Sequence, residues 1–247
     1  MTQGAADERS ESARLDARVD RIDWRRAQAQ LDTWGYARLG KLLDARQCRR
    51  LAGLYDRDAS FRKTVSMDAH RFGSGEYRYF DAPLPDVVAH LRRTLYPALA
   101  RIANDWQERF GRPDRFEPRL PAFLRRCRAE GQARPTPLLL RYRAGGWNNL
   151  HQDLYGQVAF PLQVVLLLSR PQRDFTGGEF LLVENRPRQQ SRGSALALAQ
   201  GEALVFPTQE RPVEGARGVF RASLRHGMSP LHDGERLALG VIFHDAR

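Results

Sequence analysis

The stretch that decides the fold runs from Leu138 to Tyr155, LLLRYRAGGWNNLHQDLY. Near its end a histidine and an aspartate, His151 and Asp153, stand two positions apart on a predicted β-strand. Because alternate side chains of a strand point the same way, the imidazole and the carboxylate face one spot in space. Such a pair is two-thirds of a 2-His-1-carboxylate facial triad, which holds non-haem Fe(II). An isolated pair also arises by chance on a solvated strand, so this interpretation requires a third ligand elsewhere in the chain.

Three downstream histidines could complete the set: His226, His232 and His244. His226 precedes a glycine, and Arg236 follows ten residues later at the start of the last long predicted strand. A dicarboxylate that chelates Fe(II) by its keto-acid end needs a fixed cation for its far carboxylate, and a guanidinium binds carboxylates bidentately. His232 is predicted to lie in a turn, and His244 on the surface or behind the ligands. The order of these residues therefore favours His226 as the third ligand.

The distribution of apolar residues predicts an α+β fold. From residue 136 onward, short apolar runs alternate with Gly and Pro, which is typical of a β-sandwich or barrel. Upstream, apolar residues recur every three or four positions over 85–110, which predicts a helix. We expect a double-stranded β-helix, or jelly roll, over 136–247, with supporting helices in the region 23–135. Residues 1–22 alternate in charge and are expected to form a disordered tail.

The charge of the chain makes nucleic acid a candidate partner. Its 247 residues include 40 Lys and Arg against 29 Asp and Glu, a formal net charge of +11, and Lys41 and Lys63 are the only lysines. A chain this basic attracts polyanions. A genome that favours arginine codons would explain the preference for Arg over Lys, but not the excess over acidic residues. Charge alone leaves solvation and nucleic-acid binding as alternatives.

Other features of the composition predict a cytoplasmic protein without a membrane partner. The chain has no apolar run of about 18 residues and no signal-peptide core at its N-terminus. The two cysteines, Cys48 and Cys127, lie far apart and lack metal-ligand spacing. We expect them to be inert thiols. Oligomeric state is left open.

A segment over residues 61–82 mixes Gly, Ser, Arg and aromatic residues without a helical period. It is predicted to be a loop, followed by a strand over 76–80, and is a candidate substrate lid. Basic and aromatic side chains within it could neutralise phosphates and stack on bases. These are Arg71, Phe72 and Arg78. Two tyrosines of the strand, Tyr77 and Tyr79, are instead expected to pack one strand face against a helix.

Two further stretches and one residue are candidate substrate contacts. The string NRPRQQSR is polar where a predicted strand pair ends, and it could face substrate or be a solvated turn. Its candidate residues are Arg186, Arg188, Gln190 and Arg192. The segment 111–137 is the richest in arginine, and is either a nucleic-acid-facing surface or a solvated connector. Tyr155, next to the ligand motif, is the third candidate.

In this order and strand context, His151, Asp153, His226 and Arg236 resemble the Fe(II)/2-oxoglutarate-dependent dioxygenases. The resemblance covers residues 136–247 through its motifs and the helical part more loosely. It implies that the two histidines and the aspartate hold Fe(II), that Arg236 binds the far carboxylate of 2-oxoglutarate, and that Tyr142 adds a hydroxyl to it. The implied reaction consumes O2, converts 2-oxoglutarate to succinate and CO2, and oxidises a substrate C–H bond, with ascorbate as an optional reductant.

Within that superfamily the sequence is similar to two branches. The spacing of Tyr142 to HQD and the string HGMSPLHDG resemble the AlkB demethylases of alkylated nucleic acid, whereas DFTGGEF resembles the prolyl-4-hydroxylase-like branch. AlkB proteins carry Asn, Asn and Arg where this chain has Leu140, Ala238 and Ile242. The whole C-terminal string looks most like a bacterial oxygenase family that acts on damaged DNA.

The resemblance therefore implies oxidative demethylation of alkylated nucleic acid, in DNA repair. The alternative is a prolyl-4-hydroxylase-like hydroxylation of a protein side chain or a small molecule. A non-enzymatic jelly-roll binding module is a third possibility, against which the complete triad argues.

Overall fold

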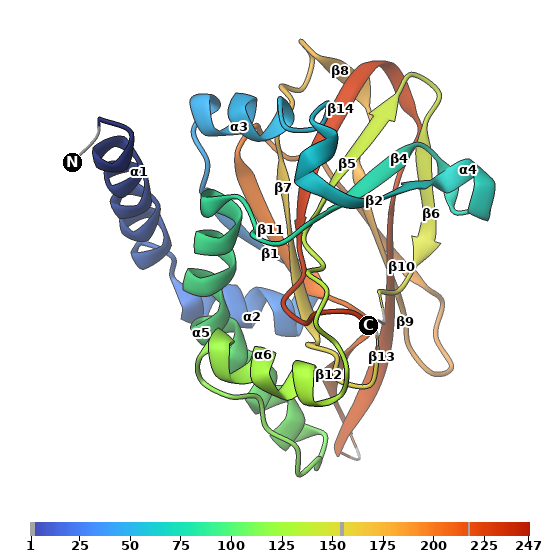
Figure 1. Ribbon diagram of the computed structural model, residues 1–247. Coiled ribbons are helices and arrows are strands. Elements are labelled where there is room, and N and C mark those ends of the chain that lie inside the picture. The colour runs from blue at the N-terminus through green and yellow to red at the C-terminus, as the bar shows by residue number, and fades with distance from the viewer. Residues whose placement is uncertain (1–2, 154–155, 217) are drawn as a thin grey trace.

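Two antiparallel β-sheets face each other, and helices cover the outer side of the larger one (Figure 1). The structure is a computed structural model that describes residues 3–153, 156–216 and 218–247. The larger sheet has the strand order β1 (Ala37–Lys41), β11 (Glu202–Pro207), β7 (Leu162–Leu167), β14 (Leu231–Val241), β5 (Leu138–Arg143), β4 (Glu76–Phe80) and β2 (Phe61–Ser66), with β8 (Phe175–Gly177) paired to β14. The smaller has the order β10 (Arg192–Leu196), β9 (Phe180–Asn185), β13 (Gly218–Met228), β6 (Trp147–His151) and β3 (Gly73–Ser74), with β12 (Glu210–Gly215) paired to β13.

Strand β7 shows why the larger sheet is the centre of the molecule. All six of its residues are buried, as expected for a strand covered on both faces. Leu162, Val164 and Leu166 belong to the core shared with the helices. Val165 and Leu167 point the other way, into the space between the sheets. The apolar run in the sequence is therefore a strand between two cores.

The helical layer contains α1 (Gln3–Asp20), α2 (Trp24–Trp34), α3 (Ala45–Ala52), α5 (Asp86–Arg109) and α6 (Leu120–Ala129). A 3-10 turn, η1 (Asp58–Ser60), leads from α3 into β2, and the single turn α4 (Met67–His70) connects β2 to β3. The period predicted over 85–110 is confirmed as α5, which buries Leu91, Leu95 and Leu99. Helix α3 begins with a capping box, in which Asp44 and Gln47 satisfy each other's backbone N–H groups.

The prediction of a disordered tail over residues 1–22 is wrong for the described part. Helix α1 places Leu15 and Val19 in the core, and Arg18 donates to the carbonyl of Leu42 at 2.8 Å. Asp16 lies 2.7 Å from Nε2 of His90 on α5, so an ion pair also joins the two helices. Two apolar residues four apart form a stripe that α5 covers, and composition alone does not reveal this stripe.

The structure also differs from the prediction in the positions of several strands and loops. The region 23–135 supplies strands β1, β2 and β4 to the larger sheet in addition to helices, and α6 interrupts the arginine-rich segment. His232 lies on β14, not in a turn, because β14 begins at Leu231. The division into a support region and a jelly-roll domain stays a prediction.

Both cysteines are free and buried, and burial raises the pKa of the Cys48 thiol to about 11. An apolar, protonated thiol of this kind is unreactive. Among the described residues, no helix combines the length and apolar character needed to cross a bilayer.

Candidate metal centre

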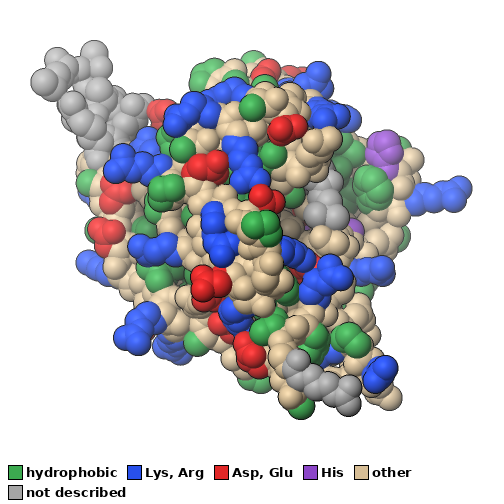
Figure 2. Space-filling model, turned by 90° about the horizontal axis from the view of Figure 1, so that it is seen from below, with side chains coloured by type: hydrophobic (Ala, Val, Ile, Leu, Met, Phe, Trp, Pro, Cys, Tyr) green, Lys and Arg blue, Asp and Glu red, His purple; other side chains and the backbone are tan. Residues whose placement is uncertain are grey.

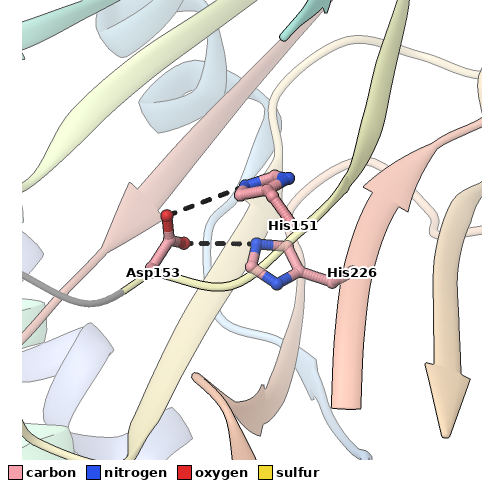
Figure 3. Close-up of side chains that lie close together, drawn as sticks. All are labelled: His151, Asp153 and His226. Carbon is pink, nitrogen blue, oxygen red and sulfur yellow. Dashed lines mark ion pairs between the residues drawn. The ribbon is translucent and has the colours of Figure 1, made fainter. Parts of the chain in front are cut away.

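Two side chains from strands β6 and β13 and one from the segment after β6 converge between the sheets. The potential ligand atoms of His151, Asp153 and His226 all lie within 4.8 Å of one another. Nε2 of His226 is 3.2 Å from one carboxylate oxygen of Asp153, and Nε2 of His151 is 3.7 Å from the other. Figure 3 shows the carboxylate facing both imidazole rings. Two imidazoles and one carboxylate are the ligand set of a facial triad, so these residues could hold Fe(II).

Sheet pairing sets the positions of the two histidines. His226 on β13 is the register partner of His151 at the end of β6, and their ring centroids are 4.2 Å apart. Asp153 was predicted to lie on the same strand as His151, but β6 ends at His151. The aspartate follows the strand and still faces both rings. The two-residue spacing therefore correctly predicted that the two side chains lie together, although Asp153 lies just beyond the end of the strand.

A hydrogen bond and burial keep His151 in the form that binds metal. Nδ1–H of His151 donates to the carbonyl of Asn149 at 2.7 Å, which leaves the Nε2 lone pair toward the cluster. Burial, followed by the neighbouring His226, lowers the pKa of His151 against the attraction of Asp153. Phe206 packs against His226 with ring centroids 4.8 Å apart. The hydrogen bond and burial favour a neutral, oriented imidazole at His151, and the contact with Phe206 packs the ring of His226 in place.

The cluster lies in a cavity of about 430 Å³ between the two sheets. At one end of it, Arg236 on β14 stands opposite Tyr142 on β5. Arg236 is 4 % exposed, and its Nε–H has no hydrogen-bond partner among the described residues. Asn148 donates to the Tyr142 hydroxyl at 3.2 Å. A buried cation without a partner fits a ligand carboxylate, so the residues present suit both Fe(II) and a dicarboxylate cosubstrate.

The structure brings most of the predicted site residues into this one cavity. Besides the cluster, Arg236 and Tyr142, the cavity is lined by Arg71 and Phe72. The three positions at which the sequence departs from AlkB proteins also line it, as apolar wall. They are Leu140, Ala238 and Ile242.

Other candidates lie away from the cavity. The guanidinium of Arg78 pairs with Asp58 at 2.5 Å and lies over the ring of Phe61, on the opposite face of β4 from the cavity. Arg186 and Arg192 pair with the buried Glu184, at 2.6 Å and 3.3 Å. Their charges are therefore largely used within the protein.

The remaining predicted residues are also not part of the cavity wall. Arg188 and Gln190 are exposed on the segment between β9 and β10 and do not line the cavity. Tyr155 lies outside the described residues. His244 is fully buried, contrary to a surface position, and its Nδ1 accepts the backbone N–H of Phe160 at 3.1 Å.

Sequence reasoning missed two groups of cavity residues. Tyr77 and Tyr79, expected to pack against a helix, face the cavity because the helices cover the other face of the sheet. Gln163, within the apolar run of β7, lines it as well. The alternation Tyr-x-Tyr indicated one shared face, but only the pairing of β4 with β5 decided which face that is.

Comparisons with known proteins agree with this geometry. A family model for an oxygenase "catalysing oxidative methylation of damaged DNA" matches residues 75–246. The chain belongs to this oxygenase family. The oxygenase is also 49% identical, over 190 residues, to an uncharacterised protein of Mycobacterium tuberculosis, found in two strains. That match covers 75% of this chain and 81% of the relative.

The fold of the oxygenase is shared with solved 2-oxoglutarate-Fe(II) oxygenases. An oxidoreductase of this class from Burkholderia pseudomallei superposes with a TM-score of 0.53 at 19% identity, covering 92% of this chain and 94% of that one. The epimerase SnoN of nogalamycin biosynthesis gives a TM-score of 0.54 at 16% identity, covering 88% and 80%. A Pseudomonas putida prolyl-4-hydroxylase gives 0.50 at 15% identity, covering 91% and 99%. These structures confirm the expected α+β jelly-roll class, and the oxygenase family model confirms the oxidoreductase assignment.

Proposed function

We propose that the oxygenase uses Fe(II), 2-oxoglutarate and O2 to remove methyl groups from alkylated bases of nucleic acid, in DNA repair. The observation that supports this proposal is one cavity lined both by the ligand cluster with Arg236 and by Arg71 and Phe72, which are exposed. A cosubstrate and a base can therefore meet at the same cluster.

His151, Asp153 and His226 would hold the metal, and Arg236 would bind the far carboxylate of 2-oxoglutarate through charge-assisted hydrogen bonds. With 2-oxoglutarate and O2, bound Fe(II) supplies an oxidant for substrate C–H bonds. Tyr142 offers its O–H beside the guanidinium. The apolar walls between the sheets limit the access of water to the site.

The rim of the cavity suits a base that leaves its stack. Phe72 is 48 % exposed and Leu150 is 40 % exposed. His70 stacks on Phe72 with ring centroids 5.3 Å apart. Aromatic surface beside an arginine is the combination that grips single-stranded or flipped nucleotides.

The rim of the cavity at Arg71 and Phe72 is hydrogen-bonded to the edge of the smaller sheet. The backbone N–H of Asn149 donates to the carbonyl of Phe72 at 2.8 Å, and its side-chain amide donates to the carbonyl of Arg71 at 3.0 Å. Strand β3 continues this pairing through Gly73 and Ser74. The segment predicted as a lid is therefore attached to β6, the strand that ends in the metal cluster, and it holds Phe72 at a fixed place beside the cavity.

The charge of the whole molecule is a weaker support. Figure 2 shows Lys and Arg side chains spread over the face seen from below and interleaved with Asp and Glu. Many arginines are paired, as Arg112 is with Glu210 at 2.5 Å. The net charge of +11 can attract a polyanion, but local contacts at the rim would have to position it.

The alternative function is hydroxylation of a protein side chain or small molecule. One observation favours it: Leu140, Ala238 and Ile242 make the wall apolar where AlkB proteins carry polar residues. An apolar wall suits an aliphatic side chain as readily as a methylated base.

The experiment compares succinate formation with three additions: a single-stranded oligonucleotide carrying one N-methylated base, the same oligonucleotide unmodified, and a proline-containing peptide mixture. We expect the methylated strand alone to stimulate turnover, release formaldehyde and lose its methyl group. Turnover driven by the peptides, with both oligonucleotides inert, would replace the demethylase proposal with the hydroxylase.

A further inference from the structure

The cavity has two chemically different ends. Arg236 and Tyr142 are paired at one end, and the same strand, β14, continues past Ala238 and Gly240 to Val241, which pairs with Val164 of β7. Gln163 is the next residue of β7 in that direction. At about 3.3 Å per residue, the two ends are separated by roughly 20 Å along the strand. A cosubstrate held at Arg236 therefore leaves the end near Gln163 for the substrate.

Gln163 is a polar residue in an otherwise apolar strand. It is 4 % exposed, and its side-chain Nε2 has no hydrogen-bond partner among the described residues. It lines the cavity, on the same face of β7 as Val165. Burying an amide donor without a partner costs stability, and nearly all buried polar groups in proteins find one. A donor of this kind in a cavity wall is explained by a partner that arrives with a ligand.

Across the larger sheet from β7, the cavity wall on β4 is aromatic, and Tyr79 lies closer to the level of Gln163 than Tyr77 does. Tyr77 and Tyr79 meet edge to face, with ring centroids 5.4 Å apart and an interplanar angle of 90°. Between them and β7 lies Gly240, where a Cβ atom would stand 3.3 Å from the side chain of Leu138. The missing side chain lets Leu138 pack closely over this glycine, so the floor here is apolar. An aromatic wall suits a flat ring, which can stack on a tyrosine or meet it edge to face.

We infer that the end of the cavity near Gln163 binds a planar heterocycle, whose ring faces the aromatic wall at Tyr79 and whose carbonyl oxygen or unprotonated ring nitrogen accepts a hydrogen bond from Gln163. Gln163 is then a specificity-determining residue of the oxygenase. This inference rests on the proposed function, because it identifies the substrate of the same site as a nucleobase. The hydrogen bond from Gln163 would distinguish one base from another, whereas the contacts with Arg71 and Phe72 would position the base.

Binding to metal-free protein tests the inference separately from catalysis. The probe is 3-methylcytidine, titrated calorimetrically into the wild type, Gln163→Met and Gln200→Met. Methionine keeps the length of glutamine without its polar atoms. Gln200 is the matched control, because its amide donates to the carbonyl of Leu168 at 2.8 Å and lies outside the cavity.

We expect the wild type to bind 3-methylcytidine, Gln163→Met to bind it about tenfold more weakly, and Gln200→Met to bind as the wild type does. For the melting temperature, we expect Gln200→Met to be the more affected variant. Gln200→Met loses a hydrogen bond and melts lower, whereas Gln163→Met loses only an unpartnered amide and melts at or above the wild-type temperature.

Equal affinity of Gln163→Met and wild type would overturn the role of Gln163, as would a fall in its melting temperature as large as that of Gln200→Met. Binding of a proline-containing peptide in place of 3-methylcytidine, or of neither probe at millimolar concentration, would overturn the heterocycle. A wild type that binds the nucleoside but leaves methylated oligonucleotides unchanged would refute the demethylase alone.

Discussion

Arg236 and Tyr142 are register partners across the β5–β14 ladder, and together they close one end of the cavity. Burial lowers the pKa of the guanidinium, and burial raises the pKa of the phenol. The phenol oxygen already accepts from Asn148, so its own O–H is available to a ligand. A cation and a hydroxyl side by side in an apolar cavity form a binding site for one carboxylate.

Arg236→Met tests this assignment. We expect the KM for 2-oxoglutarate to rise at least tenfold, because the variant loses a charge-assisted contact of about 1.5–3 kcal/mol. The melting temperature should stay level or rise, because a buried, unpartnered cation is replaced by an apolar side chain. Arg225→Met, at an exposed position of β13, is the control. An unchanged KM in Arg236→Met would transfer the role to another cation.

Asp153→Asn tests the ligand cluster. The substitution keeps the size of the side chain but removes the charge that faces both imidazoles, so we expect anaerobic Fe(II) titrations to show weakened binding. Succinate formation should fall about 100-fold or more, since even residues behind metal ligands affect activity by about 10–100-fold. His232→Ala removes an exposed histidine of β14 and should retain both properties. Wild-type iron affinity in Asp153→Asn would refute the ligand assignment.

Arg71→Gln tests the contact of the rim with nucleic acid. If Arg71 neutralises one phosphate of a single strand, the slope of log affinity against log salt should become shallower by about 0.7. Arg188→Gln removes the same charge from an exposed position outside the cavity lining, and its slope should equal that of the wild type. The measurement is fluorescence anisotropy of a labelled oligonucleotide over a range of salt concentrations. If Arg71→Gln and Arg188→Gln showed the same slope of log affinity against log salt, Arg71 would contribute only non-specific attraction to nucleic acid.

The stability of the protein should depend on the protonation of His244. Burial, followed by the charge of Arg92, lowers the pKa of His244 from 6.5 to about 4. Between these pH values the unfolded chain binds a proton that the folded chain excludes, so stability falls as the pH decreases through this window. The loss between pH 7 and pH 5 should be about 2 kcal/mol.

The measurement is urea unfolding at the two pH values. His244→Asn keeps an acceptor for the N–H of Phe160 and should show a correspondingly smaller loss between pH 7 and pH 5. His232→Asn, at an exposed site, should keep the loss of the wild type. If His244→Asn lost as much stability as the wild type, another group would account for the pH dependence.

The sequence by itself determined the features that depend on local spacing. The pair His151 and Asp153 and the helix over 85–110 each depend on residues within a few positions of one another. The order of His226 and Arg236 after them was informative because it supplies a third ligand and then a cation for a carboxylate, the latter at the start of the last long predicted strand. Spacing along one chain segment is a property of backbone geometry, which tertiary structure rarely overrides.

The tertiary structure alone decided which face of each strand is inside. A period of two defines two faces of β4, but only its pairing with β5 places Tyr77 and Tyr79 in the cavity and Arg78 outside it. The same holds for Leu15 in α1, which is buried because α5 lies beside it, and for Gln163, which an apolar run concealed. These outcomes depend on contacts between segments far apart in the chain, and local periodicity contains no information about the partner.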